Sequence, residues 1–202
     1  MIAIVEAAGW PIWPLIFASI VALGIIVERG WALRRDRVVP RTLLPKTVQE
    51  VKSKGITQDL LDRLAQGPLL ARIFAVGLRN AKSSREVMKE SIEEAGRIAM
   101  HELERFLTTI GTIASLAPIM GLFGTVVGMI EIFASQQAVG SNPTQLAHGI
   151  SVALYNTAFG LIVAIPSMIF YRHYRAHVDG LVVEMEMQAL KLVEIVHGQR
   201  EQ

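Results

Sequence analysis

The chain has 202 residues, of which 51% are hydrophobic, and it carries 20 Lys and Arg against 18 Asp and Glu. A net charge of +2, with basic and acidic residues interleaved, does not indicate a nucleic-acid-binding protein. The absence of cysteine excludes disulfide bonds and thiolate metal sites, and a mean hydropathy of +0.40 favours a membrane protein.

The first apolar run covers residues 11–27 and predicts a transmembrane helix after a short N-terminus of residues 1–10. Trp10 precedes this run, Trp13 lies at its start and Trp31 follows it, as in the aromatic belts at membrane interfaces. A cleaved signal peptide is the alternative, but no Lys or Arg precedes the run. We therefore expect a retained helix.

Residues 28–105 predict a cytoplasmic helical region. The segment 29–45 is basic and rich in proline, and Arg34, Arg35 and Arg37 are candidates for contact with anionic lipid head groups. Residues 46–66 predict one or two short amphipathic helices, and residues 69–80 predict another after Gly67-Pro68.

A capping box at residues 83–86 predicts the start of the next helix, with Ser83 accepting a hydrogen bond from the helix and Glu86 reaching back. Because no helix breaker follows before the second apolar run, we expect one long helix from about Arg85 to Ile132. Pro118 is the candidate for a kink in it.

The second and third spans are expected at residues 106–132 and 149–171, joined by a periplasmic loop at 133–148. A C-terminal cytoplasmic helix should follow at 172–202, because apolar residues recur at helical spacing to Val196. Residues 28–105 and 172–202 hold all the Lys and Arg, whereas residues 1–10 and 131–148 hold none. The Lys/Arg bias therefore predicts a periplasmic N-terminus and a cytoplasmic C-terminus.

Both of the later spans present a face of small residues that includes one threonine. These faces consist of Ala114, Pro118, Gly121, Thr125 and Gly128, with Gly124 completing a GxxxG match, and of Ala153, Thr157, Gly160 and Ala164, with Asn156 and Ser167 beside them. Close helix packing is one interpretation, since small residues let helices approach in a bilayer. Lining of a polar pore by Thr125, Thr157 and Asn156 is the other.

Titratable groups are absent from the middle of the spans. Glu131 and His148 lie at the outer edges of the second and third spans, where an interfacial position is expected. Proton relays in membranes generally use Asp, Glu or His, so a proton pathway here would need water, hydroxyls or an acid from another chain. No phosphate-binding loop, metalloprotease motif or nucleophile–base pair supports an enzyme, and the sequence suggests no cofactor.

Three segments resemble the MotA/TolQ/ExbB proton-channel family, and its ExbB and TolQ branches most closely. They are Trp13–Ile16 with Glu28-Arg29, the segment LAPIMGLFGTVVG at 116–128, and the segment ALYNTAFGLIVAIP at 153–166. The resemblance extends over nearly the whole chain.

The resemblance implies an all-α inner-membrane subunit that assembles as a cyclic pentamer. Spans two and three would line a central pore, and Thr125 and Thr157 match the family's pore threonines. About two copies of a single-span partner resembling ExbD or TolR would lie in the pore and bring the protonatable aspartate. Proton flow would drive a periplasm-spanning protein such as TonB or TolA.

One position departs from the family pattern. Many relatives carry Glu five residues before the second threonine, where this chain has Val152. On a helix, Val152 points about 140° away from Thr157, so it need not share a face with that threonine. The departure leaves open whether an outer acidic site was lost, moved to Glu131 or never needed.

Two other functions compete with a channel subunit. A structural membrane scaffold would use the same small-residue faces only for packing. A small-solute transporter would usually show internal repeats and broken helices, and this sequence shows no repeat. The sequence does not distinguish a TonB-type from a Tol-type system.

Overall fold

The computed structural model describes residues 9–139 and 143–198, and these residues form helices and turns without a β-strand. In chain order the helices are α2 (Ile12–Ala32), α3 (Arg35–Val38), α4 (Leu43–Lys54), α5 (Gln58–Ala65), α6 (Leu69–Arg79), α7 (Arg85–Leu103), α8 (Leu107–Val139) and α9 (Pro143–Val196). They divide into two compact units, the first formed by Met1–Arg29 and Phe106–His173 and the second by Gly30–Arg105 and Tyr174–Gln202.

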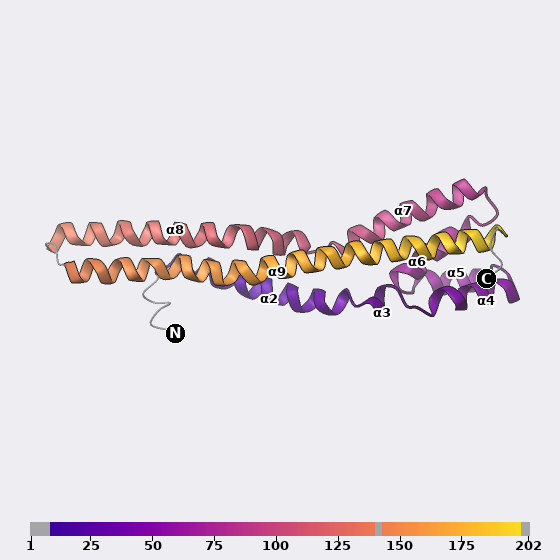
Figure 1. Ribbon diagram of the computed structural model, residues 1–202, viewed down its shortest axis with the longest axis horizontal. Coiled ribbons are helices and arrows are strands. Elements are labelled where there is room, and N and C mark those ends of the chain that lie inside the picture. Colours follow the sequence, from indigo (N-terminus) through magenta and orange to yellow (C-terminus); the bar gives the residue numbers. More distant parts are fainter. Residues whose placement is uncertain (1–8, 140–142, 199–202) are drawn as a thin grey trace. The chain divides into compact units, whose positions relative to one another are not determined.

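The first unit contains long apolar helices. Three stretches are long and apolar enough to cross a membrane, namely Ile12–Ala32, Leu107–Ala134 and Leu146–Val196, the last of which continues into the second unit. In this unit α8 lies beside the N-terminal part of α9 (Figure 1). This confirms the expected all-α fold with three apolar spans.

The core of the first unit joins α2 to both other helices. Leu15 of α2 is fully buried with Ala117 of α8 and with Val163 and Ala164 of α9. Farther along α8, the ring of Phe123 meets Trp10 edge to face, with the centroids 6.1 Å apart. Several other apolar residues of α2, such as Phe17 and Leu23, are exposed, as expected for lipid-facing side chains.

In the second unit, α5, α6 and α7 pack in sequence order. The contact of α6 with α7 is close at Gly77, where a Cβ atom would lie 2.7 Å from Ile92 Cδ1. Arg72 and Glu102 form an ion pair of 2.8 Å across the same two helices. The apolar series expected for the C-terminal helix is buried at Tyr174, Val178, Leu181, Met185, Ala189 and Leu192, whereas its last member, Val196, is half-buried.

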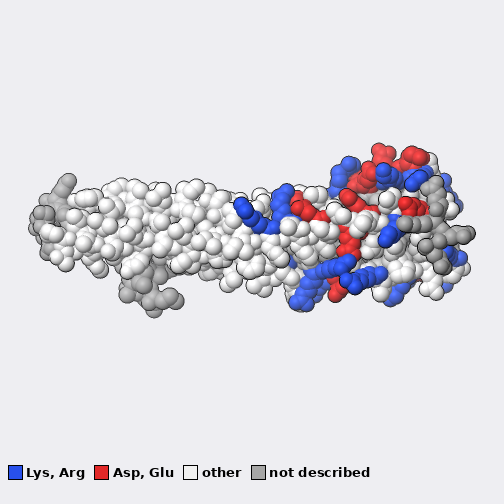
Figure 2. Space-filling view, viewed as in Figure 1, with Lys and Arg blue, Asp and Glu red and all other residues white. Residues whose placement is uncertain are grey.

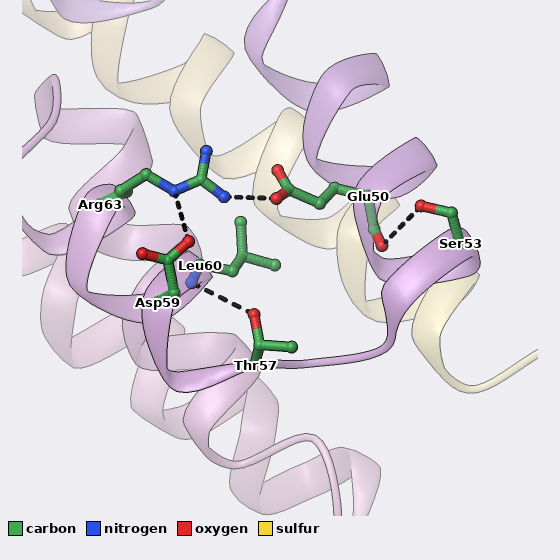
Figure 3. Close-up of polar contacts among 6 residues, drawn as sticks. All are labelled: Glu50, Ser53, Thr57, Asp59, Leu60 and Arg63. Carbon is green, nitrogen blue, oxygen red and sulfur yellow. Dashed lines mark hydrogen bonds and ion pairs between the residues drawn. The ribbon is translucent and has the colours of Figure 1, made fainter.

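Polar contacts hold α5 together and join it to α4 (Figure 3). The guanidinium of Arg63 points between two carboxylates and pairs with both Glu50 and Asp59. Thr57 is the N-cap of α5, and its hydroxyl accepts a hydrogen bond of 3.3 Å from the Leu60 amide. Residues 46–66 were expected to form one or two short amphipathic helices, and the structure has two there, α4 and α5.

The expectation of one helix from Arg85 to Ile132 is wrong. Helix α7 ends at Leu103 and α8 begins at Leu107. At the break, Phe106 has φ of 64°, in the left-handed region that bulky side chains rarely adopt. The ring of Phe106 lies 5.6 Å from the guanidinium carbon of Arg29. This long-range contact favours the break between α7 and α8. No helix-breaking residue in the local sequence predicts that break.

Two smaller expectations also differ from the structure. The N-cap of α7 is Ser84 and not Ser83, and its hydroxyl accepts a hydrogen bond of 3.3 Å from the Val87 amide. The segment 133–148 is mostly helical, because α8 continues to Val139 and α9 begins at Pro143. Residues 1–8, 140–142 and 199–202, which include most of the expected N-terminal segment, lie outside the described residues.

Candidate functional site

Glycines bring the backbones of α8 and α9 into direct contact. A Cβ atom at Gly121 would lie 2.7 Å from the carbonyl oxygen of Asn156, and one at Gly160 would lie 2.6 Å from that of Ala117. Gly128 packs on Ala153 in the same way, since a Cβ atom at Gly128 would lie 3.1 Å from Ala153 Cβ. The distances at Gly121 and Gly160 leave no room for a side chain, so glycines of the small-residue faces allow the close contact between the two helices.

The two threonines of these faces meet across the contact. Thr125 Oγ1 lies 2.6 Å from Thr157 Oγ1, and either hydroxyl could be the donor. Thr125 Oγ1 also lies 3.2 Å from the carbonyl oxygen of Gly121 on its own helix and 3.3 Å from that of Ala153 on α9. The hydroxyls therefore do more than bond to their own helix, because they form a polar link between α8 and α9.

Asn156 lies one residue before this link and is 1% exposed. Its side chain packs on Gly124, where a Cβ atom would lie 2.8 Å from both Cβ and Cγ of Asn156. Only a glycine leaves room for the amide at this level of the helix pair. The three residues expected to line a polar path thus lie together in the structure.

The remaining small residues of the two faces are spread along the same contact. Ala114 and Ala164 are buried, and Pro118 is half-buried inside α8. Ser167 is also buried, and its hydroxyl donates a hydrogen bond of 2.7 Å to the carbonyl oxygen of Val163. These positions pack the helices and leave the hydroxyl pair as the polar centre of the contact.

The end of the first unit where α8 leads into α9, here called the connection end, contains an open pocket of about 380 Å³. Glu131 of α8 and His148 of α9 line it together with Val152 and the buried Asn156. The helical angle between Val152 and Thr157 suggested separate faces, but Val152 shares this pocket with the residue next to Thr157. Sequence reasoning treated Glu131 and His148 as separate interfacial residues and missed their common pocket.

The three arginines proposed for lipid contact lie in the second unit and differ in their surroundings. Arg35 pairs with Glu184 of α9, and this hydrogen bond raises the pKa of the Arg35 guanidinium further. The guanidinium carbon of Arg37 lies 4.5 Å from the ring centroid of Trp31, while Arg34 is exposed. Arg35 is thus already engaged with a carboxylate, whereas the exposed Arg34 suits a surface contact better.

Arg29 is a further buried polar residue that the sequence did not single out for a role. It is 7% exposed, and its guanidinium forms two bonds of 2.5 and 2.6 Å with the carboxylate of Glu28. Its contact with Phe106 joins α2 to the start of α8.

Among the residues that the structure describes, no group of three or more His, Asp or Glu side chains is arranged to hold a metal ion.

Comparison with known proteins agrees with this architecture. Residues 65–187 match the family model of the MotA/TolQ/ExbB proton channel family. The ExbB-like 3 protein of Synechocystis is 31% identical over 178 residues, which cover 84% of this chain and 82% of that protein. The biopolymer transport protein ExbB of Aquifex aeolicus is 34% identical over 146 residues, covering 70% of this chain and 93% of the relative.

A Tol-Pal system protein is similar over a still larger share of the chain. TolQ of Haemophilus influenzae is 27% identical over 197 residues, which cover 92% of this chain and 86% of TolQ. The matched family segment includes α8 and most of α9, where the glycine contact and the hydroxyl pair lie. The family match, the relatives named ExbB and TolQ, and the three apolar helices together show that the chain belongs to the MotA/TolQ/ExbB proton channel family.

Proposed function

We propose that this chain is the channel-forming subunit of a proton-driven energiser in the inner membrane. Its family and its three apolar helices indicate a multi-pass inner-membrane protein of the proton-channel type. In the proposal, protons cross the membrane along the contact of α8 and α9, and their flow powers a process in the cell envelope.

The observation that carries the proposal is the bond between the hydroxyls of Thr125 and Thr157. A hydroxyl both donates and accepts a hydrogen bond, so a pair of hydroxyls 2.6 Å apart can pass a proton between them. Neighbouring Asn156 adds a buried amide to the same polar region. Polar groups inside a bilayer are costly, and they commonly face protein or a water-filled path.

The acid of the pathway would come from a second protein. Residues 111–130 of α8 and 149–171 of α9 contain no Asp, Glu, Lys, Arg or His. A single-span partner of the ExbD or TolR kind, in about two copies within a cyclic ring, would supply the protonatable aspartate. The partner would transmit the energy of proton flow to a TonB- or TolA-like protein. Relatives named ExbB and relatives named TolQ support a TonB-type and a Tol-type system, respectively.

The ring itself would be a homopentamer with α8 and α9 on the inside. Exposed apolar residues outside the membrane spans support association of several copies, because water would otherwise cover them. In the second unit these include Ile98 of α7 and Val183, Met187 and Leu190 of α9, which are 57%, 54%, 54% and 42% exposed. Packing between copies would bury these side chains.

The membrane orientation follows from the charges. Residues 28–105 and 172–202 would be cytoplasmic, and residues 1–10 with the segment 133–148 would be periplasmic. Arg34 and Arg37 would then lie near the cytoplasmic lipid head groups, where each basic residue contributes about 1 kcal/mol of attraction. Arg35 would contribute less because it pairs with Glu184.

Substituting Thr157 with Val tests the proposal, because valine keeps the shape of threonine and removes the hydroxyl. We expect proton flux through vesicles containing the complex with its single-span partner to fall strongly. The oligomer should persist, since one bond between membrane helices is worth only about 0.6 kcal/mol. Native mass spectrometry of the purified complex checks the assembly.

A structural scaffold is the competing function, since the glycine contact would serve it equally well. Substitution of Thr125 with Ala and with Val distinguishes the two functions. A scaffold should tolerate both changes while assembly persists, whereas a channel that depends on the hydroxyl should lose flux with a normal oligomer. A complex in which the Thr125 and Thr157 variants all drive the envelope process normally would contradict the channel.

A further inference from the structure

The pocket at the connection end of the first unit collects residues from all three of its helical segments. Pro11 precedes α2, Gly128 and Glu131 belong to α8, and His148 and Asn156 belong to α9. Glu131 and His148 are exposed, while Asn156 is buried at the inner end of the pocket. The pocket therefore leads from an exposed, polar mouth to the buried amide.

Two side chains give this pocket acid–base chemistry. Among the described residues that line it, Glu131 and His148 are the titratable ones, and the α2 side contributes only Pro11. Carboxylates and imidazoles are the groups that take up and release protons in membrane proton relays. No Lys or Arg lines the described wall of the pocket, so its charge favours a cation over an anion.

The pocket also ends beside the hydroxyl pair. Asn156 at its inner end directly precedes Thr157, and its side chain packs on Gly124, which directly precedes Thr125. Glu131 is six residues beyond Thr125, which corresponds to about 9 Å along the helix axis. That length exceeds one hydrogen bond, so water has to complete the connection. At about 30 Å³ for each water molecule, 380 Å³ holds enough water to do so.

We infer that this pocket is the proton-loading site of the chain, with Glu131 as the acceptor and His148 as a second base beside it. A hydronium ion at the mouth transfers its proton to a carboxylate oxygen of Glu131, so that one O–H bond breaks, another forms and water remains. The proton then leaves Glu131 for the pocket water and passes towards Thr157 and Thr125. This inference rests on the proposed channel function.

The experiment measures proton flux with a pH-sensitive dye in lipid vesicles that contain the complex of this chain with its single-span partner. Glu131→Gln combined with His148→Gln should lower the flux by about tenfold or more, because both acid–base groups are gone. Val152 lines the same pocket, so adding Val152→Glu to this double variant returns a carboxylate to the pocket and should restore most of the flux.

Two controls separate this inference from the channel proposal. Ser151→Ala changes an exposed residue of α9 near His148 that is not among the described lining residues, and it should leave the flux unchanged. Thr157→Val tests the channel itself in the same vesicles. Unchanged flux in the Glu131 and His148 double variant, with flux lost in Thr157→Val, would overturn the loading site and leave the channel standing. Equal flux in the wild type and in Thr157→Val would overturn both.

Discussion

At the scale of single residues, Phe106 has the most unusual backbone in the described chain. A left-handed conformation in a bulky residue costs about 1–3 kcal/mol and persists only where the surroundings enforce it. Here the ring of Phe106 packs near the guanidinium of Arg29, which Glu28 also holds. The break between α7 and α8 therefore coincides with a contact to a residue that is distant in the sequence.

Glu86, in the first turn of α7, provides a pH-dependent prediction. The pKa of its carboxyl is lowered by hydrogen bonds from its own backbone amide and then from the Ser84 hydroxyl. A lowered pKa in the folded state means that the stabilisation is complete above the ordinary pKa of a free glutamate. It is lost as the pH falls through the lower, folded value.

We therefore expect acid to loosen the first turn of α7 in the wild type, and Glu86→Gln to remove this pH dependence. Hydrogen exchange at the Val87 and Met88 amides, measured across the acidic range, provides the comparison. Ser83→Ala is the matched control, since Ser84 and not Ser83 is the N-cap. Equal acid sensitivity of the wild type and Glu86→Gln would show that other groups control this helix start.

At the scale of helices, glycine decides how closely α8 and α9 approach. Gly121 and Gly160 face backbone atoms of the opposite helix, and backbone cannot rotate away as a flexible side chain could. By contrast, a Cβ atom at Gly24 of α2 would meet nothing within 4 Å. The sequence does not distinguish Gly121 and Gly160 from Gly24. The difference is that the first two face the backbone of another helix, whereas Gly24 faces open space.

Gly121→Ala should destabilise the protein by about 1–3 kcal/mol, because the added methyl group forces the helices apart. Gly24→Ala should be neutral or stabilise by up to about 1 kcal/mol, since alanine favours a helix. Thermal unfolding in detergent compares the two variants with the wild type. A Gly121→Ala protein as stable as Gly24→Ala would mean that the helices separate without cost.

The sequence predicts helices better than it predicts their ends and partners. Apolar periodicity indicates the face of α9 that is buried from Tyr174 to Leu192, and Gly121 and Gly160 lie where α8 and α9 touch. The break at Phe106 was missed because no glycine, proline or asparagine marks it. The shared pocket of Glu131 and His148 was missed because its residues are distant in the sequence and meet only when the helices pair.

At the scale of the whole molecule, charge is distributed very unevenly along the chain. On the face shown in Figure 2, Lys, Arg, Asp and Glu gather on the second unit, while most of the first unit's surface carries none. This distribution suits a first unit in hydrocarbon and a second unit in water.

The absence of cysteine makes the membrane orientation easy to test. We expect Ser53→Cys, in the last turn of α4, to be protected in intact cells from a maleimide that cannot cross the inner membrane. Ala147→Cys, near the start of α9, should react, because both side chains are exposed and only the second would face the periplasm. The cysteine-free wild type is the control, and the reverse labelling pattern would contradict the proposed orientation.

If protons pass through the hydroxyl pair of Thr125 and Thr157, as proposed above, the pair has one consequence for the timing of transport. Each hydroxyl has a single proton, so the bond between them has two opposite directions, and Thr125 can turn its own proton to a carbonyl oxygen of Gly121 or Ala153. A proton that passes along the pair leaves both O–H bonds reversed. Both hydroxyls must then rotate back before the next proton can follow from the same side. The pair would thus admit protons one at a time, and the reset between them would set an upper limit on the turnover of the channel.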